Sequence, residues 1–120
     1  MHLVALLIAV LASAAIIFLG ARFLISPSRA TLDFGVAAGN ARALAATKGV
    51  RDITSGVIMM VVWAAGGSTA LGWALVAVAI TPIADALIVL TNGGKPATAF
   101  GIHGVTAALL IAAGLVLALA

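Results

Sequence analysis

ITSGVIMMVVWAAGGSTALGWALVAVAITPIA, residues 53–84, is an unbroken stretch without a charged side chain. It is too long for one ordinary membrane span, because a bilayer core is crossed by about 20 apolar residues. Gly66-Gly67-Ser68-Thr69, in its middle, has the composition of a turn. The stretch therefore predicts two helices, over residues 41–65 and 70–90, that are joined by a tight turn.

Two further apolar runs flank this pair of helices. Residues 3–25 carry no charge before Arg22, and residues 97–120 follow a loop in which Gly93-Gly94 ends one helix and Pro96 starts the next. Residues 26–40 contain Ser26-Pro27 and predict an amphipathic or re-entrant connector at the membrane surface. The expected fold class is all-α, a single domain over residues 1–120 that forms a bundle of four transmembrane helices.

The N-terminal run has a second interpretation, as a cleaved secretory signal. Ala12-Ser13-Ala14 resembles a cleavage site, but no Lys or Arg precedes it and the apolar run continues beyond it. We therefore expect a retained span.

Composition excludes several classes of protein. Hydrophobic residues make up 65% of the chain and charged residues 8%, whereas a soluble domain has about 25% charged residues. This excludes a soluble globular enzyme and a disordered chain, and the absence of Cys excludes disulfides and thiolate chemistry. The net charge of +3 predicts contacts with the lipid bilayer, and nucleic acid is not an expected partner.

The distribution of basic residues predicts an orientation in the cell membrane. Five of the six Lys and Arg residues lie between Arg22 and Arg51, Lys95 lies in the third connector, and the second connector has none. Because basic loops stay in the cytoplasm, we expect a multi-pass protein with both termini outside.

Three ionisable side chains are predicted to lie at one depth. Counted from the outer ends of their helices, Asp52, Asp85 and His103 all fall in the cytoplasmic third of the bilayer. Ionised groups there are costly, so they must face the bundle interior and have partners. Arg22 is long enough to reach the same layer.

This layer predicts an acid–base site. We expect Asp85 and Asp52 to divide the acid and base roles, His103 to act as the complementary group, and Arg51 to stabilise developing negative charge. The residues expected to bind substrate are Arg22, Lys48, Ser55, Thr81 and Thr106. No metal or other cofactor is expected, since Arg51 and Lys48 would oppose a cation.

Each assignment has a structural alternative. Lys48 and Arg51 would then only reach the phosphates of the lipid surface. Asp52 would only neutralise these cations, Asp85 would form a structural salt bridge, and Pro82 would only kink its helix.

The segments Lys48-Gly49-Val50-Arg51-Asp52-Ile53-Thr54-Ser55-Gly56, Pro82-Ile83-Ala84-Asp85-Ala86-Leu87 and His103-Gly104 resemble those of a family. It is a family of small four-span bacterial membrane proteins, catalogued as a domain of unknown function and similar in layout to DoxX-like proteins. The resemblance covers about residues 34–108 and implies a four-helix bundle with Arg51, Asp52, Asp85 and His103 as its polar set. It implies no reaction. Small multidrug transporters have four spans too, but they depend on a Glu in the first span, which has no acid here.

Three functions fit these residues. The favoured one is a cofactor-independent membrane isomerase, cyclase or hydrolase, which isomerises, cyclises or opens an epoxide in a lipophilic small molecule. A proton-coupled transporter would use Asp85 and His103 as a relay, but the outer halves of the predicted spans are almost wholly apolar. A structural or accessory subunit would use the charges to hold helices together. The sequence leaves open the substrate, a homo-oligomeric state, and the binding of haem, flavin or quinone.

Overall fold

The computed structural model describes residues 1–37 and 39–120. These residues form helices and no strand, which confirms the all-α prediction. The helices are α1 (His2–Ile25), α2 (Pro27–Phe34), α3 (Ala41–Val78), α4 (Ile80–Thr91), α5 (Pro96–Thr98), the π-helix η1 (Ala99–Gly104) and α6 (Val105–Leu119). The chain divides into two compact units, Met1–Lys48 and Gly49–Ala120, which are described separately.

The first unit is dominated by α1 and α2. α1 ends at Ser26, and Pro27 then begins α2, because the ring of Pro is compatible with the first turn of a helix but not with its interior. α2 ends at Gly35, whose φ of 115° suits a residue without a Cβ. The predicted surface connector, residues 26–40, thus contains a short helix.

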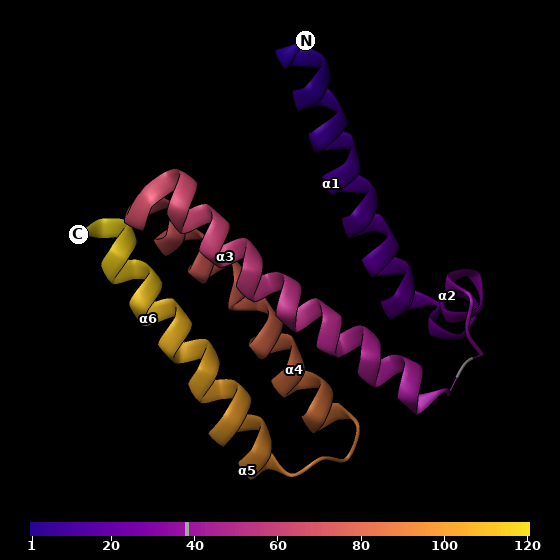
Figure 1. Ribbon diagram of the computed structural model, residues 1–120. Helices are drawn as coiled ribbons and strands as arrows, with labels where there is room; N and C mark the ends of the chain where they lie inside the picture. The colour runs from indigo at the N-terminus through magenta and orange to yellow at the C-terminus, as the bar shows by residue number, and fades with distance from the viewer. Residues whose placement is uncertain (38) are drawn as a thin grey trace. The chain divides into compact units, whose positions relative to one another are not determined.

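The second unit reverses direction at Gly67. This residue lies inside α3 but has φ 76° and ψ −173°, a conformation that glycine adopts readily and other residues do not. Figure 1 shows α3 folding back on itself, so that its last part and α4 return alongside its earlier part. The reversal lies within the turn predicted at residues 66–69.

A second break separates α3 from α4 at Ala79. It lies three residues before Pro82, which is buried and has no N–H to donate to the carbonyl of Val78. Backbone hydrogen bonds from Ala79 to Leu75 and from Ile83 to Ala79 still bridge the break. The returning leg therefore continues through α4.

Small residues hold the returning leg close to α6. A Cβ added to Gly72 would lie 2.6 Å from the carbonyl oxygen of Gly114, and one added to Gly114 would lie 2.7 Å from that of Gly72. Such close backbone approach is typical of helix packing in lipid, where small residues take the place of a hydrophobic core. This crossing is the tightest helix contact that the glycines of the second unit show.

In the part of the chain that the structure describes, three helical stretches are long and apolar enough to cross a membrane: His2–Ile25, Ala41–Thr91 and Pro96–Leu119. The second of these has 51 residues and includes the reversal at Gly67. The helices thus have the length and composition of a membrane protein.

The C-terminal helix differs from the prediction of one regular helix over residues 97–120. It begins with α5, continues as the π-helix η1 and becomes α-helical only from Val105. A π-turn holds one more residue than an α-turn, so it changes the direction in which the following side chains point.

Candidate functional site

The reversal at Gly67 brings Arg51 and Asp85 together. The two residues lie about 16 and 18 residues from Gly67 on either side, which is roughly 25 Å along each leg. In two antiparallel legs, equal separations from the turn place side chains at the same level. An Arg51 guanidinium nitrogen (Nη2) lies 3.6 Å from Oδ1 of Asp85.

Arg51 also lies beside Asp52. Its Nε is 3.6 Å from Oδ1 of Asp52. The side chain of Asp85 is 16% exposed, against 51% for Arg51 and 49% for Asp52. Both Arg51–carboxylate distances exceed the usual range for an N–H···O hydrogen bond, so these contacts are ion pairs without hydrogen-bond geometry. One guanidinium thus lies between a half-exposed and a nearly buried carboxylate.

His103 lies in the π-helix η1, which packs against α4, the helix of Asp85. Its side chain is partly buried. The two members of the predicted acid–base pair are therefore placed on neighbouring elements. A direct bond between the imidazole of His103 and the carboxylate of Asp85 stays a prediction.

The hydroxyl groups predicted to bind substrate have local partners. Ser55 donates a hydrogen bond to the carbonyl oxygen of Arg51 at 2.9 Å, and Thr106 donates one to that of Ile102 at 2.7 Å. Thr81 is partly buried, one turn before Asp85 on α4. Lys48 is exposed and is the last residue of the first unit.

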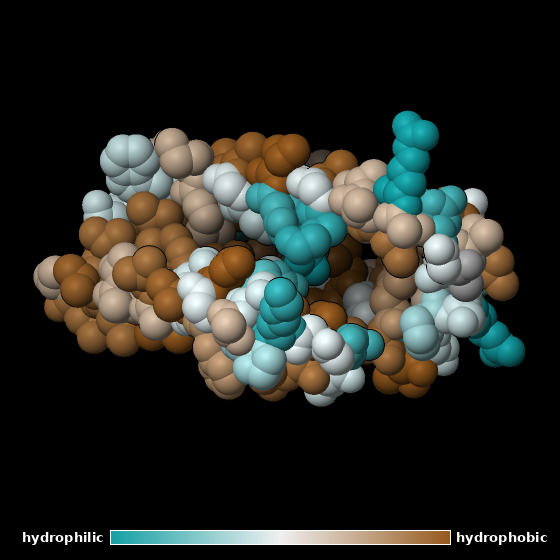
Figure 2. Space-filling model, turned by 90° about the horizontal axis from the view of Figure 1, so that it is seen from below, coloured by the Kyte–Doolittle hydropathy of each residue, from teal (hydrophilic) through white to brown (hydrophobic). Residues whose placement is uncertain are grey.

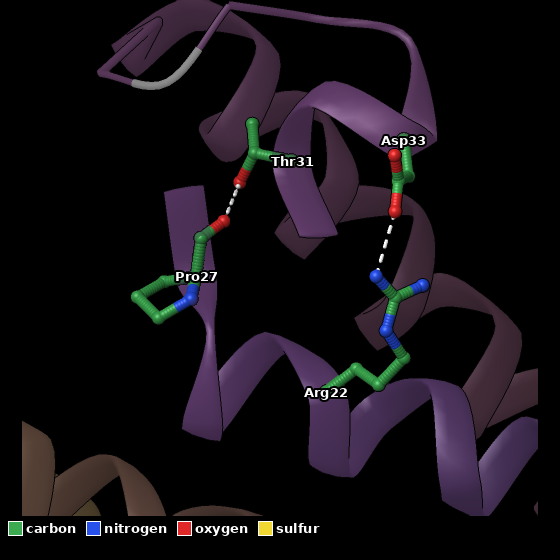
Figure 3. A network of polar contacts seen from close by, with 4 residues as sticks. All are labelled: Arg22, Pro27, Thr31 and Asp33. Atoms are coloured by element: carbon green, nitrogen blue, oxygen red, sulfur yellow. Dashed lines mark hydrogen bonds and ion pairs between the residues drawn. The ribbon is translucent and has the colours of Figure 1, made fainter. Parts of the chain in front are cut away.

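Arg22 has a partner that the sequence did not predict. Its Nη2 donates a hydrogen bond to Oδ2 of Asp33 at 2.6 Å, from the last turn of α1 to α2 (Figure 3). Beside this pair the structure has a cavity of about 410 Å³. The only signal in the sequence was the presence of opposite charges on either side of Ser26-Pro27. The predicted role of Arg22 in the layer of Asp52 and Asp85 stays a prediction.

Figure 2 shows one face of the molecule, on which hydrophilic side chains lie among hydrophobic ones. Among the described residues, no group of three His, Cys, Asp or Glu side chains could hold a metal ion.

The Arg51 cluster, which consists of Arg51, Asp52 and Asp85, has a defined chemical capacity. A guanidinium is a planar donor of five N–H bonds, so it can bind an anionic or carbonyl oxygen in addition to its carboxylate neighbours. A carboxylate that is largely shielded from solvent can accept or return a proton. The cluster therefore combines N–H donors that can bind an oxyanion with one shielded carboxylate, Asp85, that is a candidate proton carrier.

A family comparison matches most of the chain. The family described as a domain of unknown function, DUF4267, matches residues 13–117. This range is wider than the residues 34–108 on which the resemblance was based. No curated protein and no solved structure matches the chain.

Proposed function

We propose a function from the site itself, because this chain belongs to DUF4267, a family whose function is unknown. The protein is a four-span integral membrane protein that carries out acid–base chemistry on a lipophilic small molecule. Its spans are α1, the two legs of α3–α4 on either side of Gly67, and the helix from Pro96 to Leu119. The proposal includes isomerisation, cyclisation or epoxide opening, none of which consumes a redox cofactor.

One observation carries this proposal: the Arg51 guanidinium lies 3.6 Å from Oδ1 of Asp52, through Nε, and 3.6 Å from Oδ1 of Asp85, through Nη2. A purely structural pair gains most when it closes to about 2.7–2.9 Å. The open spacing leaves N–H groups of Arg51 able to bind a substrate oxygen as negative charge develops on it.

The roles follow from the surroundings of each group. Asp85, the more shielded carboxylate, exchanges a proton with the substrate, and Asp52 balances the charge of Arg51. His103 lies on η1, which packs against the helix of Asp85, and it exchanges the second proton with the substrate. Thr81 lies one turn from Asp85 and is the hydroxyl group best placed to orient the substrate.

A second candidate function rests on the same contact. Arg51 and Asp85 lie on different legs of the hairpin, so their pair also ties two helices together. In an accessory subunit, the Arg51 cluster would serve only to hold the two legs of the hairpin together.

The test compares small molecules that co-purify with the wild type, Asp85→Asn and Asp33→Asn. Lipophilic extracts of each purified protein are analysed by mass spectrometry after circular dichroism and gel filtration have verified folding. Asp33→Asn is the matched control, because it makes the same chemical change in the other Arg–Asp pair. We expect a compound whose amount in the Asp85→Asn extract is at least about tenfold lower than in the wild type, or which appears there in altered form. Its amount in the Asp33→Asn extract should equal that in the wild type.

Two outcomes contradict the proposal. If all three proteins fold and carry phospholipids but no other lipophilic compound, the Arg51 cluster does not bind a specific lipophilic substrate. If Asp85→Asn fails to fold while Asp33→Asn folds normally, the helix-tying role is the better account. Arg51→Lys then provides a milder variant, since it keeps the charge but not the planar donor group.

A further inference from the structure

The junction of α1 and α2 at Ser26, with the cavity beside it, is called the elbow here. It forms a second polar site, separate in sequence from the Arg51 cluster. We propose that it binds one zwitterionic phospholipid, whose phosphate pairs with Arg22 and whose ammonium group pairs with Asp33. This inference does not depend on the proposed acid–base chemistry, because every residue that lines the elbow belongs to the first unit.

The cavity is built from two matching helix faces. Leu19, Arg22 and Phe23 line it from α1, at positions i, i+3 and i+4. The facing residues from α2 have the same spacing, and they are Ala30, Asp33 and Phe34. Its volume, about 410 Å³, is within the range of small-molecule sites.

The hydrogen-bonding groups of Arg22 and Asp33 can bind a ligand in addition to each other. Arg22 donates through Nη2 to a single carboxylate oxygen, Oδ2 of Asp33, as Figure 3 shows. A guanidinium has five N–H donors and a carboxylate has two acceptor oxygens, so a one-to-one contact leaves both groups able to bind more. A phosphate would take the remaining Arg22 donors, and an ammonium group would donate to the second oxygen of Asp33. Such a ligand adds to the existing pair and does not have to break it.

Lipid is the occupant that the position of the elbow favours. α1 is apolar along its length, is long enough to cross a membrane and carries Arg22 in its last turn. Its 24 residues span about 36 Å, against about 30 Å for the hydrocarbon core, so the last turn reaches the head-group layer. The elbow thus lies where phosphate and ammonium groups of lipids are concentrated.

The remaining lining suits the apolar part of the same lipid. Phe23 and Phe34 pack edge to face with ring centroids 6.2 Å apart, and Leu19 and Ala30 complete the apolar wall. Within α2, Thr31 is buried and donates to the carbonyl oxygen of Pro27 at 2.6 Å, so the helix itself does not depend on the Arg22–Asp33 pair. A charge variant of the elbow is therefore expected to fold.

The experiment measures retained lipid by native mass spectrometry of the full-length protein in detergent. The protein is supplied in turn with phosphatidylethanolamine, phosphatidylcholine and phosphatidylglycerol. We expect phosphatidylethanolamine to be retained about fivefold more than phosphatidylglycerol, because only the former has an ammonium group that donates to Asp33. Asp33→Asn should remove this preference, Arg22→Gln should lower retention of all three lipids, and Arg29→Gln, which changes an exposed cation outside the lining, should change neither.

Two further arms distinguish binding in the elbow from binding elsewhere on the protein. Ala30→Phe fills the cavity without altering charge and should lower phosphatidylethanolamine retention about as much as Arg22→Gln. Free phosphoethanolamine, the head group without acyl chains, should not displace the lipid. Equal retention of phosphatidylglycerol, an unchanged preference in Asp33→Asn, or displacement by phosphoethanolamine would each overturn the proposal.

Discussion

Two Arg–Asp pairs differ in a way that reverses the usual expectation. Arg22 and Asp33 form a 2.6 Å hydrogen-bonded pair, although their side chains are 32% and 58% exposed. Arg51 and Asp85 stand 3.6 Å apart, although Asp85 is only 16% exposed. The pair with the more shielded carboxylate is thus the looser of the two.

The difference follows from how each pair is built. Arg22 and Asp33 are 11 residues apart, on two helices joined by one short turn, so their side chains can adjust to each other locally. Arg51 and Asp85 meet only because the chain reverses at Gly67, and their separation is set by helix packing. An exposed pair contributes about 0–1 kcal/mol, whereas the attraction between Arg51 and Asp85 is screened less by solvent, because the Asp85 side chain is only 16% exposed.

The largest effect is expected from a substitution that disrupts the close packing of Gly72 against Gly114. This helix packing bears on the Arg51–Asp85 pair and not on the Arg22–Asp33 pair. Gly114→Leu would add side-chain atoms at a position where even a Cβ would lie 2.7 Å from the carbonyl oxygen of Gly72. We expect a loss of about 2–3 kcal/mol of stability or more, since backbone on both sides cannot yield easily. Thermal unfolding in detergent measures it. Gly56→Ala, at a helical glycine with open space around its Cβ, is the control and should not destabilise the protein. An equally stable Gly114→Leu would show that this crossing does not hold the second unit together.

An intermediate effect is expected from the same substitution in each pair. Asp85→Asn should lower stability by about 1–3 kcal/mol, because the Arg51 guanidinium loses its less exposed partner. Asp33→Asn should cost less than about 1 kcal/mol, since solvent screens its exposed pair. Chemical unfolding followed by circular dichroism compares the two variants. A larger loss for Asp33→Asn would mean that hydrogen-bond length, and not burial, determines the strength of these pairs.

The smallest expected effect is a difference in salt dependence. Double-mutant cycles with Arg22→Gln and Asp33→Asn should give a coupling energy of about 0.5 kcal/mol that falls by roughly half in 1 M salt. The corresponding cycle for Arg51 and Asp85 should change less, because Asp85 is largely hidden from solvent ions. If both couplings fell equally, Asp85 would be as accessible to solvent ions as Asp33.

Several features of the fold could be predicted from the sequence because they depend on local chemistry. Runs of apolar residues predicted the helices, and Gly66-Gly67 predicted the reversal, since glycine alone adopts the required conformation at little cost. Counting residues along the two legs predicted one level for Asp52 and Asp85, and Arg51, the neighbour of Asp52, lies beside both carboxylates. The resemblance to a family of unknown function also came from the sequence, and the match to a domain of unknown function over residues 13–117 agrees with it at that level.

Other features depend on packing between helices, which the local sequence pattern does not reveal. The π-helix around His103 packs against α4, and the extra residue in its turn is not visible in the spacing of apolar residues. The partner of Arg22 depends on the angle at which α2 leaves Ser26, which brings Asp33 within 2.6 Å. The sequence by itself thus determined which residues are helical and at what level the charges of the hairpin lie. Only the tertiary structure decided which charges touch and how closely, because a shift of about one ångström in packing separates a hydrogen bond from an open ion pair.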